Sequence, residues 1–529
     1  MRSARYVLAF LASVAILLAA CSGGQQPAGG GSASPAAAAK AVYGGTVTFA
    51  IDTDPIDFDP LKSRAFVDRN VHYQMYDSLV RIDETGKIIP WLATKWENST
   101  DGKTVTFTLR DDVTYHDGTK FDADSVKWNI DRYRTTAGSQ RSGELASIDS
   151  VEVVNPTSVK FNLKAPFAPL LANLVDRSGM MLSRKVVEAG GEDFTRKAFK
   201  AGSGPFILTE AVKDDHITLE KNPNWWGKDK DGNKLPYLDK VIIKPILDSS
   251  VRFTNLRTND AQAANAIAGK DVPTAKSESG LQYQEKAAYS FRSIIPNEAP
   301  GFVFSDHRYV KAVSMAIDRA ELLDKGYFGL GVAGYGTIAP GHFAFDSSFK
   351  PFEKADVDGA KKLIQQIGKP LSFVLLVPSG DPVGLQIAQL IQAQLKKADI
   401  QMELQSLEFA AILDQQTKHT FKDMTFVGWS GRVDPDGNTY DHVYSKRPFN
   451  DSSYSNAQVD KLLDDSRATF DEAKRKDALR KAEQIFVVDD PARVWLGFGA
   501  AQLLTSRKVQ APPVYPDQII RFQLMSMAK

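Results

Sequence analysis

The sequence predicts an α/β protein, and two stretches of its second half carry that prediction. Residues 371–377 form a continuous apolar run, residues 382–395 place apolar side chains on one helical face, and residues 400–404 alternate, which is the pattern of a β-α-β unit. A second apolar run, residues 424–427, ends in a polar loop. Such proteins bind ligands outside the carboxyl ends of their strands, so this loop is a candidate site.

The first residues are typical of an export signal. Arg2 and Arg5 precede an apolar run over residues 6–20, and small residues then lead to Cys21. The tetrapeptide Leu-Ala-Ala-Cys that ends at Cys21 resembles a bacterial lipoprotein signal. We therefore expect residues 1–20 to be a signal peptide and Cys21 to become a lipid-modified amino terminus. The alternative is an ordinary cysteine just past a signal peptide.

A flexible tether follows the cysteine. Residues 22–40 are rich in Gly, Ser, Pro and Ala and lack apolar periodicity, so we assign residues 21–42 to the lipidated Cys21 and a linker. No later apolar run reaches the roughly 18 residues of a membrane-spanning helix, so the mature protein is not expected to span a membrane.

The body begins with alternating strands and helices. Residues 45–51 and 104–109 alternate as strands, and the second of these follows a hairpin turn at residues 101–103. Residues 68–79 and 122–133 carry apolar side chains at helical spacing, which predicts two helices.

The later body predicts three further helices. Residues 307–323 have helical spacing, and we expect Asp318 and Arg319 to face solvent or each other. Residues 456–486 predict two helices, with Phe470 among the inward side chains.

Composition excludes several kinds of function. Lys plus Arg total 65 and Asp plus Glu total 64, so the basic excess of a nucleic-acid-binding protein is missing. Cys21 is the only cysteine, which excludes an internal disulfide and a cysteine-based metal cluster. No serine nucleophile motif of the Gly-x-Ser-x-Gly kind occurs, and none of the seven histidines has a neighbour at ligand spacing. We expect no cofactor and no metal.

The polar loop after residue 427 combines three kinds of ligand contact. Trp429 offers a flat apolar wall with one N–H donor, Arg432 offers a planar fork for a carboxylate or phosphate, and Asp434 and Asp436 follow. The alternative is an ordinary turn, because Asp-Pro-Asp-Gly is strong turn chemistry and Arg432 can pair with Asp434. Asp434 and Asp436 do not suit a glycosidase pair, because its carboxylates normally come from separate elements.

An ordered set of short motifs runs through roughly residues 43–505: Asp57-Phe-Asp-Pro60, Ile89-Pro-Trp-Leu-Ala93 with Trp96, Asp101-Gly, Phe107-Thr-Leu-Arg110, His116-Asp-Gly118, Ala123-Asp-Ser-Val126, Gly202-Ser-Gly-Pro-Phe206, Asn222-Pro-Asn-Trp-Trp226, Ala316-Ile-Asp-Arg319 and Gly428-Trp429. In this order the motifs resemble those of the extracytoplasmic substrate-binding proteins of ABC importers for peptides, nickel and related solutes, known as solute-binding protein family 5.

The resemblance implies two α/β lobes of the periplasmic-binding-protein kind (class II, large), with an extra subdomain in the first lobe and a ligand cleft between the lobes. We expect the first lobe over residues 43–290, the second over 291–490, and a return to the first over 491–529. The two crossings are expected near residues 285–300 and 487–497, and residues 493–498 are expected to form the returning strand.

The resemblance also bears on the solute. Dipeptide and oligopeptide binders of the family carry an Asp at the third position after the Gly-Trp tryptophan, where it holds the peptide ammonium, and here that position is Arg432. Arg177 falls where nickel-chelate binders place an Arg. Two arginines suit an anionic solute: an opine-like amino-acid conjugate, a modified peptide or an acidic metallophore. The expected ligand-binding residues are Trp429, Arg432, Asp434, Arg177, Phe66 and Ser379.

The function implied is capture of a small polar solute or short peptide and its delivery to an ABC transporter permease. We expect no enzymatic activity, no nucleic-acid partner, a monomer, and an extracytoplasmic location at the membrane through the lipid on Cys21. The alternatives are a secreted hydrolase acting on a peptide or glycoside, and an adhesin or structural lipoprotein, which would not need two α/β lobes.

Overall fold

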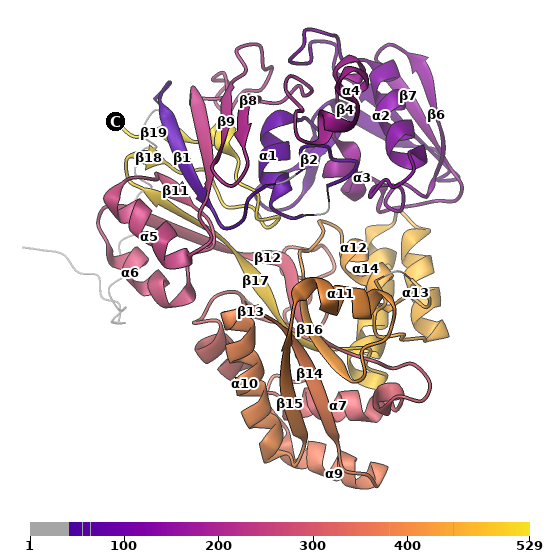
Figure 1. Cartoon of the computed structure of the whole chain (residues 1–529). Coiled ribbons are helices and arrows are strands. Elements are labelled where there is room, and N and C mark those ends of the chain that lie inside the picture. Colours follow the sequence, from indigo (N-terminus) through magenta and orange to yellow (C-terminus); the bar gives the residue numbers. More distant parts are fainter. Residues whose placement is uncertain (1–41, 56, 64, 380, 448) are drawn as a thin grey trace, which may run out of the picture. The chain divides into compact units, whose positions relative to one another are not determined.

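The computed structural model describes residues 42–529 except residues 56, 64, 380 and 448 (Figure 1). The predicted signal peptide, Cys21 and nearly all of the predicted linker lie outside the described residues. Among the helices of the described part, none is both long enough and apolar enough to cross a membrane.

A mixed sheet of eleven strands runs through the described chain, and two long strands form its middle. These are β12 (Leu281–Pro296) and β17 (Val494–Ser506), which pair antiparallel and lie side by side in Figure 1. On one side of the pair the sheet continues through β11 (Ala263–Ala264), β1 (Thr46–Ile51), β10 (Lys240–Pro245), β9 (His216–Lys221) and β8 (Phe206–Val212). On the other it continues through β16 (Met424–Trp429), β14 (Ser372–Pro378) and β15 (Gln401–Leu407), while β13 (Val332–Ala333) pairs with β17.

The β-α-β unit expected from the sequence is confirmed. Strands β14 and β15 are parallel neighbours, and α10 (Pro382–Lys397) connects them. Strand β16 lies on the other side of β14 and is also parallel to it. The carboxyl ends of all three strands therefore share one edge, and the polar loop after Trp429 starts there.

Helices cover the part of the sheet around β14 and β16, and we call residues 297–493 the second lobe. Its α-helices are α7 (His307–Ala316), α8 (Arg319–Glu321), α9 (Val357–Ile367), α10, α11 (Phe409–Thr417), α12 (Pro435–Val443), α13 (Ala457–Arg467) and α14 (Glu472–Gln484). Val310 of α7, Ile364 of α9 and Ile391 of α10 pack with Leu375 of β14 and Phe426 of β16 in one core. Burial of these apolar faces holds the strands that present the loop.

A second sheet of four antiparallel strands belongs to the first part of the chain, residues 42–280, which we call the first lobe. Its strands, in the order β4-β5-β7-β6, are β4 (Ala93–Asn98), β5 (Thr104–Leu109), β7 (Ser158–Leu163) and β6 (Ile148–Asn155). Helix α2 (Ala123–Thr135) packs on this sheet, and Asp122 and Ser125 cap its start by hydrogen-bonding each other's backbone N–H. We call this sheet with α2 the extra subdomain.

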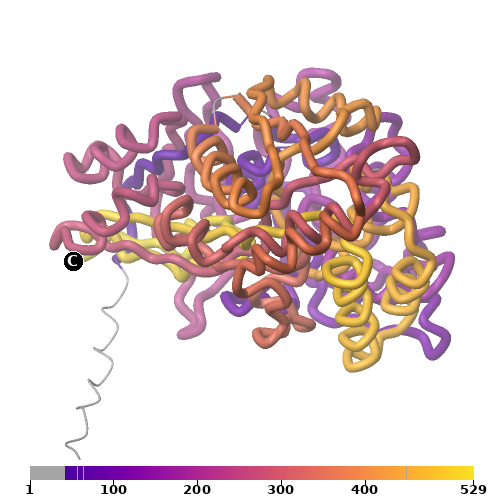
Figure 2. The backbone as a smooth tube through the Cα atoms, turned by 90° about the horizontal axis from the view of Figure 1, so that it is seen from below, coloured from indigo at the N-terminus to yellow at the C-terminus, as the bar shows by residue number. Residues whose placement is uncertain are grey.

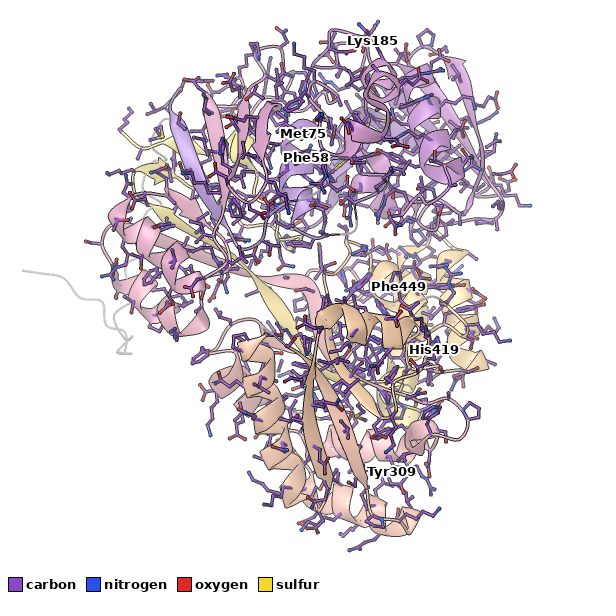
Figure 3. The ribbon with its side chains drawn as sticks, in the orientation of Figure 1. Phe58, Met75, Lys185, Tyr309, His419 and Phe449 are labelled. Atoms are coloured by element: carbon purple, nitrogen blue, oxygen red, sulfur yellow. The ribbon has the colours of Figure 1, made fainter. Side chains whose placement is uncertain are left out.

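The extra subdomain shares one hydrophobic core with the rest of the first lobe. Phe107 of β5 and Ile130 of α2 belong to the same buried cluster as Phe49 of β1 and as Phe58 and Met75, two residues labelled in Figure 3. The remaining short elements of this region and of the C-terminal segment are α1 (Asp68–Met75), β2 (Val80–Ile82), β3 (Ile88–Pro90), α3 (Leu170–Asn173), α4 (Arg184–Gly190), α5 (Ser249–Thr258), α6 (Val272–Ser277), β18 (Val509–Gln510) and β19 (Ser526–Met527).

The helix expected over residues 68–79 is shorter than the spacing predicts. Helix α1 ends at Met75, and the chain then enters strand β2. The guanidinium of Arg81 donates to the carbonyl oxygens of Tyr73 (3.3 Å) and Tyr76 (2.7 Å), so it satisfies groups that the ended helix leaves open.

Three expectations for the second lobe are wrong. The helix expected over residues 307–323 breaks after Ala316, and Arg319 is buried rather than facing solvent or Asp318. Its Nε donates to the carbonyl of Trp495 at 2.7 Å, and Asp318 instead caps α8. The two helices predicted in residues 456–486 are confirmed as α13 and α14, but Phe470 lies in their connection and is 40% exposed.

The expected crossings overlap the two long strands. Residues 285–300 include most of β12, residues 487–497 include the start of β17, and the strand expected over 493–498 is confirmed as part of β17. Figure 2 shows the yellow C-terminal segment running back among first-lobe elements, where Met527 bridges Val42. The division into residues 43–290, 291–490 and 491–529 stays a prediction that this topology supports.

Candidate functional site

The loop between β16 and α12, residues 430–434, is held by features that its sequence explains. Asp434 caps α12 by accepting a hydrogen bond from the Asp436 N–H at 2.9 Å, and Pro435 occupies the first turn of the helix. Gly431 has a φ of 78°, and a Cβ at this position would lie 2.4 Å from the carbonyl carbon of Tyr289. Only glycine fits this turn, which brings the loop against β12.

This loop, residues that follow it, and two first-lobe segments, residues 140–147 and 167–177, line one cavity of about 540 Å³. We call its first-lobe residues the subdomain side: Gln140, Arg141, Gly143, Glu144, Ala146, Ser147, Phe167, Ala172, Asn173, Asp176 and Arg177. We call its second-lobe residues the loop side: Trp429, Ser430, Arg432, Val433, Asp434, Asp436, Gly437, Asp441, Arg447, Phe449 and Arg467. The volume suits a ligand of small-molecule or short-peptide size.

Arg432 is the loop-side cation that lacks a carboxylate partner. Its guanidinium lies 4.4 Å from the centre of the Trp429 ring, and Nη1 donates to Ser430 Oγ (3.2 Å) and to the Gly431 carbonyl (2.9 Å). Within the described part of the chain, no carboxylate oxygen lies within 4.0 Å of its nitrogens. Burial lowers the pKa of Arg432 from its ordinary value. A half-buried cation stacked on an aromatic wall is suited to bind an anionic group.

The two loop aspartates are already neutralised by arginines from other helices. Arg475 of α14 donates to both oxygens of Asp434 at 2.9 Å, and Arg467 of α13 donates to both oxygens of Asp436 at 2.7 and 2.9 Å. The alternative expectation that Arg432 pairs with Asp434 is therefore wrong. Both aspartates contribute mainly to holding α12 against α13 and α14.

The arginines on the subdomain side, and Arg69 next to it, share few carboxylates. Asp176 lies 2.8 Å from Arg69 Nε and 3.9 Å from Arg177 Nε, and Arg141 pairs with Glu144 at 2.7 Å. Although burial by itself raises the pKa of the Asp176 carboxyl, Arg69 and Arg177 hold that pKa well below its usual range. Asp176 is thus ionised, and a positive excess remains beside it.

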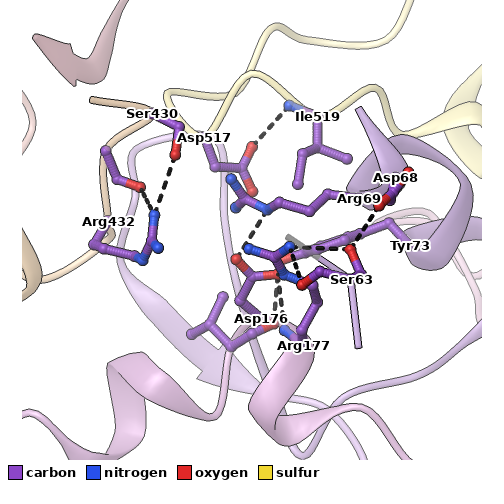
Figure 4. Close-up of polar contacts among 12 residues, drawn as sticks. Ser63, Asp68, Arg69, Tyr73, Asp176, Arg177, Ser430, Arg432, Asp517 and Ile519 are labelled. Carbon is purple, nitrogen blue, oxygen red and sulfur yellow. Dashed lines mark hydrogen bonds and ion pairs between the residues drawn. The ribbon is translucent and has the colours of Figure 1, made fainter. Parts of the chain in front are cut away.

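Arg177 is held as rigidly as Arg432. Its Nη1 donates to the carbonyl and to the Oγ of Ser63, both at 3.1 Å, and to the carbonyl of Ala65 at 3.3 Å. Burial lowers its pKa to about 9, so the side chain remains charged at neutral pH. Figure 4 shows Arg69, Asp176 and Arg177 on one side and Arg432 with Ser430 on the other. Both arginines line the same cavity.

The predicted binding residues do not all line this cavity. Trp429, Arg432, Asp434 and Arg177 do. Phe66 is half-buried and does not line this cavity, and the guanidinium of Arg69 lies 5.3 Å from its ring centre. Ser379 lines a separate cavity of about 270 Å³ and donates to Glu408 Oε1 at 3.0 Å. Contact of Phe66 or Ser379 with solute stays a prediction.

Several cavity residues carried no signal in the sequence. Arg141, Glu144, Asp441, Arg447, Phe449 and Arg467 occur in no motif, and the fold brings them together from separate elements. Phe449, labelled in Figure 3, adds a second aromatic ring 5.4 Å from that of Trp429. Asp176 is the exception, because its position next to Arg177 marks it as a partner. Among the described residues, no group of three or more His, Cys, Asp or Glu side chains is arranged to hold a metal ion.

The fold and cavity define a two-lobed binding protein, in which lobes joined by paired strands enclose a polar, aromatic-lined site. Comparison with known proteins identifies the family. Residues 87–451, more than half of the chain, match the family described as "Bacterial extracellular solute-binding proteins, family 5 Middle". The chain belongs to this family, whose members serve ABC importers, and the hydrolase alternative is not supported.

Three relatives illustrate the range of the family. The glutathione-binding protein GsiB of Escherichia coli (strain K12) is 25% identical over 493 residues, which cover 90% of this chain and 93% of that protein. The periplasmic binding protein DppA of Helicobacter pylori, solved with the peptide STSA, is 26% identical, with a TM-score of 0.79 over 92% of this chain and 99% of that chain. The binding protein AgaA of Agrobacterium tumefaciens R10, solved with agropinic acid, has a TM-score of 0.79 at 22% identity over the same shares of the two chains, which shows the shared fold.

Proposed function

We propose that this protein captures a small anionic, peptide-like solute outside the cytoplasm and delivers it unchanged to an ABC permease. The observation that carries the proposal is the pairing of the charges in and next to the cavity, where Arg69 and Arg475 bind lining carboxylates from outside the lining. Arg432 lacks a carboxylate partner among the described residues. On the subdomain side Arg141 and Arg177, together with Arg69 from outside the cavity lining, pair only with Asp176 and Glu144. A solute that brings negative charge would balance this excess on entry, whereas a cationic solute would add to it.

The relatives support this class of solute without naming it. Glutathione, the ligand in the name of GsiB, is a tripeptide with two carboxylates and one ammonium group, so it is net negative at neutral pH. In this proposal Arg432 and Arg177, which both line the cavity, receive one carboxylate each or share one. The carboxylates of Asp176 and Glu144, near the same arginines, are candidates to receive an ammonium group.

A thermal-shift panel tests the charge preference. The panel contains glutathione, agropinic acid, the peptide STSA, and STSA with a C-terminal amide, which is net positive. We expect the two anionic compounds, glutathione and agropinic acid, to raise the melting temperature and the amide to have no effect. A ligand that binds only the native state stabilises that state by mass action. Mass spectrometry of the compound that copurifies with the protein gives the natural solute. A neutral or cationic copurified solute would overturn the proposed class.

We propose further that Cys21 carries the lipid anchor, that the protein acts as a monomer, and that it does not turn its solute over. Cys21→Ser should release the protein from membranes and leave solute binding intact, because two acyl chains are enough for stable anchoring. Conversion of the copurified solute during long incubation with purified protein, beyond one equivalent, would contradict the absence of activity.

A further inference from the structure

The backbone of Arg432 is held from both sides by two buried polar side chains that do not line the cavity. Its N–H donates to Asn438 Oδ1 at 2.8 Å, and its carbonyl accepts from His342 Nε2 at 2.8 Å. Asn438 lies in α12, whereas His342 comes from a segment nearly a hundred residues earlier. Arg432, whose guanidinium has no carboxylate partner among the described residues, thus has both of its peptide groups bound by side chains.

Asn438 uses its whole hydrogen-bonding capacity. Its Oδ1 accepts from the Arg432 N–H and from Trp429 Nε1 at 3.1 Å. Its Nδ2 donates to the carbonyls of Tyr289 (3.0 Å) and Thr337 (3.1 Å). The side chain is fully buried, so each of these bonds forms without competition from water.

These bonds connect the ligand loop to the middle of the large sheet. Tyr289 belongs to β12, the long strand that continues from the first lobe into the second. Thr337 is itself fixed, because its N–H donates to Glu483 Oε1 at 3.0 Å and its Oγ1 lies 2.6 Å from that of Thr439. Asn438 therefore ties Trp429 and Arg432 to two anchored backbone positions.

His342 complements this attachment. Its Nδ1 accepts from the Ala339 N–H at 3.0 Å, so the proton of the neutral ring is on Nε2, which donates to Arg432. Its ring stacks on that of Tyr289, with centroids 4.6 Å apart and an interplanar angle of 13°. Burial lowers the pKa of His342 to about 4, so the neutral form is present at pH 7.

We propose that Asn438 and His342 are positioning residues, which fix Arg432 and Trp429 in the binding geometry before the solute arrives. A loop of this length would otherwise lose freedom on binding, and that loss would weaken affinity. If their role were only structural, the two side chains would form hydrogen bonds with core groups alone. Of the six hydrogen bonds that Asn438 and His342 make, however, three go to Arg432 and Trp429. The proposal rests on the proposed function only for its second readout below.

The first readout is independent of any solute. The protein is labelled with ¹⁵N at its seven tryptophan indoles, and the Trp429 signal is identified by its loss in Trp429→Phe. In Asn438→Leu we expect the Trp429 indole signal to shift and its N–H exchange to accelerate by about tenfold or more, because its acceptor is gone. Asn129→Leu is the control: Asn129 is also fully buried and makes three hydrogen bonds, to Ser125 and Leu182 in the first lobe. It should lose stability without moving the Trp429 signal.

The second readout is affinity for glutathione, measured by titration calorimetry. Asn438→Leu and His342→Phe should each weaken binding by about tenfold to a hundredfold, whereas Asn129→Leu should change it less than about threefold. His342→Phe keeps an aromatic ring beside Tyr289 and removes only the hydrogen bonds, so it covers the case in which Asn438→Leu does not fold.

The outcomes separate the two proposals. An unchanged Trp429 indole signal in folded Asn438→Leu overturns the positioning role, as does wild-type glutathione affinity in both variants. If glutathione does not bind the unchanged protein, this result counts against the proposed anionic solute class. The Trp429 indole signal still decides whether Asn438 holds Trp429. If Asn438→Leu does not fold, an unchanged Trp429 signal in folded His342→Phe counts against the proposal.

Discussion

The two sides of the cavity handle charge differently. On the loop side each carboxylate has its own arginine: Asp434 pairs with Arg475, Asp436 with Arg467 and Asp441 with Arg447. On the subdomain side Asp176 is shared by Arg69 and Arg177. The pKa directions follow this difference, because burial raises the pKa of Asp436 despite its arginine, whereas Arg69 and Arg177 outweigh burial and lower that of Asp176. One-to-one pairs build the fold, and a shared carboxylate leaves cations for a ligand.

The largest expected effect separates Arg432 from its neighbour Asp434. Removing one partner of a buried ion pair costs about 3–5 kcal/mol, so Arg432→Ala should weaken binding of the anionic panel compounds by roughly two to four decades. Asp434→Asn should instead lower the free energy of unfolding by about 1–3 kcal/mol, because Arg475 loses its ionised partner. Titration calorimetry and denaturant unfolding on both variants measure the two quantities.

The control for this pair is the melting temperature of Arg432→Ala, which should stay close to that of the unchanged protein because no carboxylate partner is lost. A loss of affinity below about one decade in folded Arg432→Ala would contradict its role as an anion clamp. Equal effects of both substitutions on affinity would mean that the loop side acts as a single charged unit.

The next effect concerns a carboxyl group behind the loop side. Glu483 accepts hydrogen bonds from the N–H groups of Thr337 and Ile338, yet burial dominates and raises its pKa to about 7. Because the folded pKa exceeds the unfolded one, its stabilising contribution is complete below pH 4.5 and is lost as pH rises towards 7. The free energy of unfolding should fall over this range by about 3 kcal/mol from this group alone.

Glu483→Gln should remove that part of the pH dependence, as measured by denaturant unfolding at pH 5 and pH 7.5. Glu472→Gln on the same helix is the matched control, because Glu472 is exposed. If the free energy of unfolding of Glu483→Gln depends on pH as that of the unchanged protein does, Glu483 is ionised throughout this range. The residues behind the loop side would then include a buried anion.

A smaller effect tests whether the subdomain side needs a planar fork or only a charge. Arg177→Lys keeps the positive charge but cannot reach Ser63 and Ala65 together as the guanidinium does. We expect affinity for glutathione to fall by about tenfold. Arg134→Lys, which removes a comparable set of carbonyl contacts in the extra subdomain, should leave affinity unchanged. Equal affinity in Arg177→Lys and the unchanged protein would reduce Arg177 to a point charge.

Much of the fold follows from local pattern. The β-α-β unit around α10, strand β16, and the pair α13 and α14 were predictable because each is long, periodic and bounded by turn residues. The early end of α1 and the buried Arg319 were not, because Arg81 and the carbonyl of Trp495 decide them from outside the segment. The periodicity of apolar residues indicates which face of a helix is buried. It does not indicate which polar group from another segment will form hydrogen bonds with that helix.

The candidate site also has a part that local sequence predicts and a part that depends on residues distant in the sequence. Trp429, Arg432 and Asp434 share one loop after a strand, so sequence placed them together. The arginines that pair with the aspartates could not be predicted from the sequence, because Arg467 lies 31 residues from Asp436 and Arg475 lies 41 residues from Asp434. These long-range ion pairs decide which arginine lacks a carboxylate partner. The prediction of that arginine therefore requires the packing of α12 against its neighbours.

The smallest expected effect marks the edge of the site. Ser379 follows β14, so the carboxyl-end rule makes it a candidate, yet it is exposed and lines a different cavity with Arg292, Asp381 and Phe409. Its side chain donates a hydrogen bond to Glu408, and surface substitutions of this kind usually change stability by less than about 0.5 kcal/mol. Ser379→Ala should therefore alter glutathione affinity by less than about twofold by titration calorimetry. A tenfold loss in a protein with an unchanged melting temperature would place solute in both cavities. The site would then extend past β16, and the charge balance of the two sides would have to include Arg292 and Asp381, which pair at 3.1 Å.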